Sequence, residues 1–150
     1  PGIRDQVEAF LAAGDPVYFT LDTHGEDYLQ TQEGKGLPVP HCIAGTPGWQ
    51  LYGDLAQYHG DTRVTLVEKP TFGSVELARL VQERQGEGPH AFHLMGLVTN
   101  ICVISNAALL KPHFPESDFI IHGSLCGGGD RTLHKSALSV MESLLMQVLP

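Results

Sequence analysis

The sequence predicts an α/β fold, a three-layer αβα arrangement in which a mostly parallel, doubly wound sheet lies between helices. Four short apolar segments rich in β-branched or aromatic residues predict strands, at residues 16–21, 63–67, 90–95 and 118–122. Four segments with apolar residues at helical spacing predict the main helices, at residues 3–13, 74–85, 100–111 and 132–148. Strands that alternate with helices are typical of βαβ units and a parallel sheet.

Local signals support the individual elements. Gly14 directly follows the first helical segment, as expected at a helix end, and Ser74 is a candidate N-cap for the helix at 74–85. Residues 23–47 contain repeated Gly and Pro without a period, which predicts a long loop, and residues 48–58 predict a short helix. Doubly wound sheets usually begin with a central strand, whereas this chain opens on a helix. We therefore expect the first central strand to precede residue 1.

Composition limits the possible functions. With 150 residues and 42% apolar content, the chain is expected to form a single domain over 1–150. The formal net charge of -8 argues against nucleic acid and anionic membrane surfaces as partners. No run is long and apolar enough to span a bilayer, and no signal-peptide pattern opens the chain, so we expect a cytoplasmic protein. Three cysteines without CxxC spacing argue against a disulfide framework.

Two histidines and an aspartate form the first candidate site. Asp22 and His24 lie two residues apart at the end of the first strand, so both side chains are expected to point the same way, and His41 lies at the far end of the loop. Two imidazoles and a carboxylate suit Zn, Fe or Mn and leave positions open for water or substrate. The alternative is a strand-end turn with solvated histidines.

Lys69 and Cys102 each follow a predicted strand, at the edge where open α/β sheets place their chemistry. A cysteine in a strand–helix turn lies near unpaired backbone N–H groups, which favour the thiolate and can bind an oxyanion. Lysine nearby would lower the thiol pKa or stabilise a developing anion. The alternatives are a surface lysine and a buried structural cysteine. We interpret Cys42 as a packing residue and Cys126 as a loop thiol.

Four blocks in this order resemble the isochorismatase-like cysteine hydrolase superfamily, and most of all its nicotinamidase-type amidohydrolases. The blocks are Asp22-Thr23-His24, Pro40-His41-Cys42-Ile43-Ala44-Gly45-Thr46-Pro47-Gly48, Lys69-Pro70-Thr71-Phe72, and Gly96-Leu97-Val98-Thr99-Asn100-Ile101-Cys102-Val103. Their order and spacing agree over nearly the whole chain. The resemblance implies a hydrolase that acts on a small amide, with nicotinamide as the leading candidate, and a homo-oligomeric assembly.

The resemblance also implies residue roles. Cys102 would be the nucleophile, Lys69 a member of the catalytic triad, and the backbone N–H groups of Val98 and Cys102 the oxyanion hole, with a cis peptide bond between Leu97 and Val98. The metal ligands would be Asp22, His24 and His41. The metal would be a divalent Zn, Fe or Mn ion that orients the pyridine nitrogen of the substrate.

Three departures from the family pattern affect the expected activity. The triad aspartate belongs to the first strand, and no residue of this chain matches it. Pro38 stands where nicotinamidases usually carry a tryptophan that stacks on the pyridine, and Asn100 replaces the usual aspartate of the turn. An isochorismatase-type or other small-molecule cysteine hydrolase, or a catalytically impaired binding homologue, is therefore the alternative function.

Overall fold

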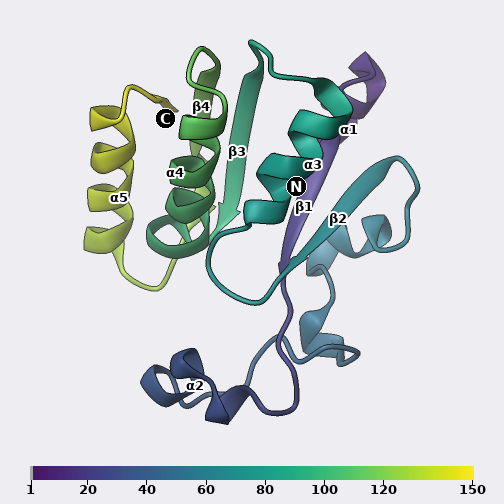
Figure 1. Cartoon of the computed structure of the whole chain (residues 1–150), viewed down its shortest axis with the longest axis vertical. Coiled ribbons are helices and arrows are strands. Elements are labelled where there is room, and N and C mark those ends of the chain that lie inside the picture. The colour runs from purple at the N-terminus through teal and green to yellow at the C-terminus, as the bar shows by residue number, and fades with distance from the viewer. Residues whose placement is uncertain (1) are drawn as a thin grey trace. The chain divides into compact units, whose positions relative to one another are not determined.

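A computed structural model describes residues 2–150 of the chain. The chain divides into two compact units, Pro1–Thr71 and Phe72–Pro150, and each is described here by itself (Figure 1). Among the described residues, no helix is long and apolar enough to cross a membrane.

The first unit contains a two-stranded parallel sheet. Helix α1 (Gly2–Ala13) precedes strand β1 (Val17–Asp22), which pairs with β2 (Val64–Lys69). Gly14, with a φ of 84°, adopts the left-handed conformation that lets the chain leave α1 and turn into β1. Tyr58 is fully buried, stacks on Phe19 of β1 and donates a 2.6 Å hydrogen bond to Glu8 of α1. This contact fixes the helix on one face of the strand pair.

The segment between β1 and β2 is not a featureless loop. It contains four short helical elements, which are the 3-10 helix Tyr28–Gln30, helix α2 (Gln32–Gly36), and the 3-10 helices Pro47–Trp49 and Gly53–Tyr58. The helix predicted at 48–58 is thus two separate 3-10 helices. Gly53, with a φ of 60°, lies at the break between them.

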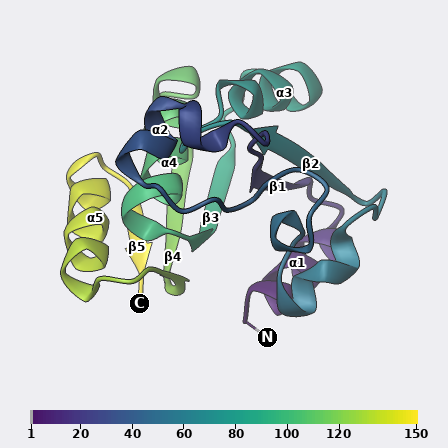
Figure 2. The same ribbon diagram turned by 90° about the horizontal axis from the view of Figure 1, so that it is seen from below.

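The second unit contains a three-stranded parallel sheet in the order β3-β4-β5. Its elements are α3 (Val75–Gln85), β3 (Ala91–Leu97), a π-helical turn (Thr99–Val103), α4 (Ile104–His113), β4 (Asp118–Gly127), α5 (Arg131–Ser143) and β5 (Gln147–Leu149). Figures 1 and 2 show α4 and α5 beside this sheet.

Alternating residues of β4 form the core of the second unit. Phe119 and Ile121 are buried, and Phe119 stacks with Phe92 of β3, which in turn contacts Phe114 at the end of α4. A Cβ at Gly123 would lie 3.4 Å from Leu138 of α5, so the same face of β4 also meets that helix. The odd-numbered residues of β4 therefore lie on the face of the sheet that packs against α4 and α5.

The predicted α/β class with parallel strands is confirmed, but three details are wrong. The described strands form two sheets rather than one, because β1 pairs with β2 and β3 only with β4. The helix predicted at 132–148 ends at Ser143, since Leu145 has a φ of 64°, and the residues that follow form β5. Cys126, predicted as a loop thiol, lies within β4.

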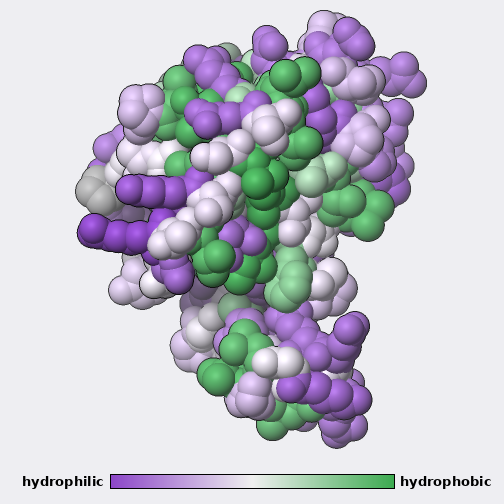
Figure 3. Space-filling view, turned by 90° about the vertical axis from the view of Figure 1, so that its left-hand side faces the viewer, coloured by the Kyte–Doolittle hydropathy of each residue, from purple (hydrophilic) through white to green (hydrophobic). Residues whose placement is uncertain are grey.

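Some apolar side chains of α5 remain exposed. Leu133 and Val140 lie seven residues apart on the helix and are 50% and 46% exposed. Figure 3 shows the side of the molecule that carries α5, where apolar side chains lie among polar ones.

Candidate active site and metal centre

Lys69 and Asp22 meet at the carboxyl ends of β1 and β2. The register of the two strands places these residues opposite each other, and the Lys69 ammonium donates to the Asp22 carboxylate. Lys69 is 2% exposed, and its Nζ also donates a 3.0 Å hydrogen bond to the carbonyl of Thr71. A lysine buried to this extent needs a charged partner, because an unpaired ammonium is costly away from water.

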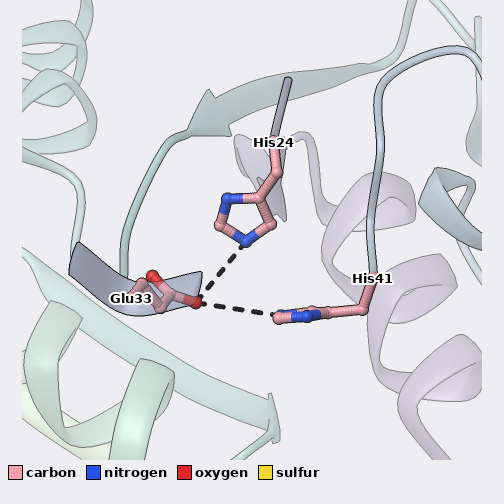
Figure 4. Close-up of side chains that lie close together, drawn as sticks. All are labelled: His24, Glu33 and His41. Carbon is pink, nitrogen blue, oxygen red and sulfur yellow. Dashed lines mark ion pairs between the residues drawn. The ribbon is translucent and has the colours of Figure 1, made fainter. Parts of the chain in front are cut away.

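Directly beyond β1, two histidines and a glutamate form a cluster (Figure 4). Oε1 of Glu33 lies 3.6 Å from Nε2 of His24 and 3.8 Å from Nε2 of His41. The three ligand atoms all lie within 4.8 Å of one another. Nε2 of His24 is buried and has no hydrogen-bond partner among the described residues, which is rare for a buried polar atom. This donor set fits a divalent transition metal.

Backbone pairing and one tautomer orient the two histidines. The His24 amide donates to the carbonyl of Cys42 at 3.0 Å, and the Ala44 amide donates to the carbonyl of His24 at 2.9 Å. Nδ1 of His41 lies 2.8 Å from the carbonyl oxygen of Val39. Since a carbonyl only accepts, this Nδ1 carries the proton, which leaves the lone pair of Nε2 directed at the cluster.

Tyr28 and Gly34 position the glutamate. The ring of Tyr28, 1% exposed, lies 4.7 Å from the ring of His24 and 5.0 Å from that of His41, and its hydroxyl donates to the carbonyl of Leu37. A Cβ at Gly34 would lie 2.0 Å from the carbonyl oxygen of Tyr28, so only glycine fits there. This close approach brings the neighbouring Glu33 against the histidines.

The structure brings together two of the three predicted metal residues. His24 and His41 lie in the cluster, whereas the carboxylate in contact with them is that of Glu33, which the sequence reasoning did not single out. Asp22, predicted to point the same way as His24, contacts Lys69, and its role as a metal ligand stays a prediction. Nothing in the sequence distinguishes Glu33 from Glu26 or Asp27 of the same loop, because its position depends on the packing of Gly34.

The turn that carries Cys102 is built from backbone. The peptide bond between Leu97 and Val98 is cis, as the resemblance implies, and the π-helical turn follows at once. The carbonyl of Val98 accepts from the amides of Ile101 and Val103, at 3.0 and 3.2 Å. Cys102 is half-buried within this turn.

Asn106 attaches the turn to the start of α3. Its buried side-chain amide donates to the carbonyl of Cys102 at 2.9 Å, and its Oδ1 accepts from the amide of Ser74 at 2.9 Å. The hydroxyl of Ser74 accepts from the amide of Leu77, which confirms Ser74 as the N-cap of α3. One asparagine thus fixes both the nucleophile candidate and the neighbouring helix end.

The thiol of Cys126 is in a different environment. Cys126 lies opposite Gly96 in the pairing of β3 with β4. Burial raises the pKa of the Cys126 thiol, and a backbone hydrogen bond with Gly96 lowers it by less. This cysteine is therefore protonated at neutral pH, which disfavours it as a nucleophile.

The fold and these features define a class of α/β proteins with a cysteine at a strand–helix turn and, beyond the end of another parallel strand, a histidine–carboxylate cluster. The family model of the isochorismatase domain matches residues 1–149, and the chain belongs to this family.

Known relatives agree with this assignment. The chain is 35% identical over 113 residues to the uncharacterized isochorismatase family protein PncA of Bacillus subtilis (strain 168), a match that covers 70% of this chain and 59% of that protein. The chain therefore spans less than two thirds of this curated relative.

Solved structures show the same fold. The crystal structure of the nicotinamidase/pyrazinamidase PncA from Bacillus subtilis is similar with a TM-score of 0.84 and 29% identity, covering 97% of this chain and 81% of that one. The pyrazinamidase of Pyrococcus horikoshii, solved in complex with zinc, has a TM-score of 0.79 at 21% identity and covers 99% of this chain and 83% of its own. This second likeness is one of fold alone.

Proposed function

We propose that the protein is a metal-containing cysteine amidohydrolase that hydrolyses a small amide, with nicotinamide as the leading candidate. The observation that carries this proposal is the cluster of His24, Glu33 and His41 in a chain that also presents Cys102 at a strand–helix turn. Similarity to a solved nicotinamidase/pyrazinamidase supports the amide as substrate.

His24, Glu33 and His41 would hold a divalent metal ion, Zn, Fe or Mn, and Asp22 remains a predicted further ligand. Two observations support this assignment, namely that Nε2 of His24 has no hydrogen-bond partner among the described residues and that Nδ1 of His41 carries the proton. When bound, the ion supplies a Lewis-acidic position for the ring nitrogen of the substrate.

In the proposed mechanism, the Cys102 thiolate attacks the amide carbonyl. The carbon–sulfur bond forms as the carbonyl π pair moves to oxygen, and the backbone N–H groups of Val98 and Cys102 donate to that oxyanion. When the pair returns, the carbon–nitrogen bond breaks, and the amide nitrogen leaves with the proton from the thiol as ammonia. Water then hydrolyses the thioester to the carboxylic acid and regenerates the thiol.

The thiol proton needs a carboxylate base near Lys69. The resemblance assigns that role to an aspartate, and no residue of this chain matches it. Among the described residues, the ion pair between Lys69 and the carboxylate of Asp22 supports a role for the lysine beside a carboxylate. The proposal also includes a cytoplasmic homo-oligomer, supported by the exposed Leu133 and Val140 of α5.

Pro38 favours a second candidate function. It replaces the tryptophan expected to stack on a pyridine ring, and its side of the loop is exposed. An isochorismatase-type or other cysteine hydrolase with a different small substrate would use the same Cys102 and Lys69. Such an enzyme would not need the histidine–glutamate cluster, so metal analysis of the purified protein separates the two candidates.

The deciding experiment measures ammonia released from nicotinamide by the native protein loaded with zinc. We expect Cys102→Ala to lower kcat by about a thousandfold or more, because the covalent step is lost. Cys126→Ala is the matched control and is expected to stay within about twofold, since its protonated thiol takes no part. Failure to release ammonia from any amide tested, or full activity of Cys102→Ala, would contradict the proposal.

A further inference from the structure

Thr99 occupies a special position in the cysteine turn. It is fully buried and directly follows Val98, whose amide is a proposed oxyanion donor. Its Oγ1 lies 3.1 Å from the carbonyl oxygen of Gly127, the last residue of β4, and 2.8 Å from Nδ1 of His134 on α5. One hydroxyl therefore joins the turn to a strand end and to a helix.

The chemistry of these groups fixes the direction of both hydrogen bonds. A threonine hydroxyl has a single proton, and the Gly127 carbonyl can only accept, so Thr99 donates to Gly127. The oxygen of Thr99 then accepts from His134, which requires the proton of the imidazole to be on Nδ1. The result is a directed chain from His134 through Thr99 to Gly127.

Both ends of this chain are held by backbone. Asp130 caps α5, with Oδ1 accepting from the amides of Thr132 and Leu133 at 2.7 and 3.0 Å, and the carbonyl of Asp130 accepts from the His134 amide at 3.0 Å. At the other end, Gly127 lies opposite Leu97 in the pairing of β4 with β3. The position of His134 is thus set by the first turn of α5.

We infer that His134, acting through Thr99, is a positioning residue for the oxyanion hole. The two hydrogen bonds of Thr99 hold the backbone at Val98 and Thr99 against β4. The donor amides therefore keep their direction when the oxyanion forms. This inference rests on the proposed function, because it assigns His134 a role in the same reaction. His134 would affect only the step in which the oxyanion develops. The reactivity of the Cys102 thiolate would be unchanged.

Two reactions of Cys102 separate these effects. Hydrolysis of nicotinamide passes through an oxyanion, whereas alkylation by iodoacetamide forms a carbon–sulfur bond and expels iodide without one. We expect Thr99→Val and His134→Leu each to lower kcat by about 10–100-fold, with KM and the alkylation rate of Cys102 changed by less than about threefold. Thr99→Ser, which keeps the hydroxyl, is expected to restore kcat.

His113→Leu is the matched control for the removal of an imidazole. His113 is exposed at the end of α4, where its Nδ1 lies 2.9 Å from the carbonyl oxygen of Leu109 and its ring lies 6.4 Å from that of Phe114. If kcat and the alkylation rate of Cys102 fell by the same factor in Thr99→Val, the hydrogen bonds of Thr99 would have a merely structural role. That result would overturn the inference. Unchanged kcat in both Thr99→Val and His134→Leu would overturn it as well.

NMR tests the same inference without any activity. We expect the nitrogen signals of His134 to show the proton on Nδ1, and the amide signals of Val98 and Cys102 to shift in Thr99→Val and to return in Thr99→Ser. If the wild-type protein hydrolyses no amide, the proposed function fails and these signals alone decide the inference. A proton on Nε2 of His134, or unmoved amide signals, would overturn it.

Discussion

The histidine–glutamate cluster and the cysteine turn are built from different parts of the chain. The cluster consists of side chains that a long loop collects, with His24 and His41 on either side of Glu33. The turn consists of consecutive backbone groups between Leu97 and Val103, fixed by hydrogen bonds of the backbone and of buried side chains. The cluster should therefore respond to loss or displacement of a ligand side chain, and the turn to a shift of its backbone.

The largest effect expected on the cluster is loss of metal binding in His41→Ala. Removal of one ligand should weaken zinc binding by more than about 100-fold, because even residues that only orient ligands contribute 10–100-fold. Isothermal titration calorimetry measures this change, with His113→Ala as a control that removes a histidine elsewhere. Unchanged zinc affinity would show that the cluster is a solvated group of side chains.

A second prediction concerns crowding within the cluster. In Gly34→Ala the new Cβ would lie 2.0 Å from the carbonyl oxygen of Tyr28, so α2 must move and displace Glu33. We expect zinc affinity to fall about 10–100-fold. Gly36→Ala on the same helix is the matched control, because no atom lies within 4 Å of its Cβ. Equal zinc affinities in the two variants would show that Glu33 is not a ligand of the metal.

The smallest effect is expected for added bulk beside the cysteine turn. In Gly128→Ala the new Cβ would lie 2.7 Å from Cγ1 of Val98, whereas Gly129→Ala meets nothing within 4 Å. Val98 must shift in the first variant, which should lower kcat about tenfold and leave zinc affinity unchanged. Steady-state kinetics and calorimetry of both variants test this. A loss of zinc affinity in Gly128→Ala would show that the cysteine turn and the histidine–glutamate cluster do not act independently.

The same difference explains how far the sequence predicts the site. Chemistry at the carboxyl ends of strands follows from the pattern, so Lys69 and Cys102 are correctly placed at the ends of β2 and β3. The partners of these residues do not follow from it. Asp22 contacts Lys69 because of the register between two parallel strands, and the strands that pair lie far apart in the sequence.

The missed elements have physical reasons too. Glu33 reaches the histidines because Gly34 allows a close backbone approach, which depends on tertiary packing and not on periodicity. Strand β5 is only three residues long, which is too short for an alternating pattern. The division into two sheets depends on which strands pair, and the alternation of strands and helices leaves that choice open.

The parallel pairing of the strands has a consequence for the order in which the protein folds. Val17 pairs with Val64 across the long segment that contains the histidine–glutamate cluster, whereas Ala91 pairs with Asp118 across a single short helical connection. Closing the longer loop costs more chain entropy and delays the contact. The sheet beside the cysteine turn is therefore expected to form before β1 pairs with β2.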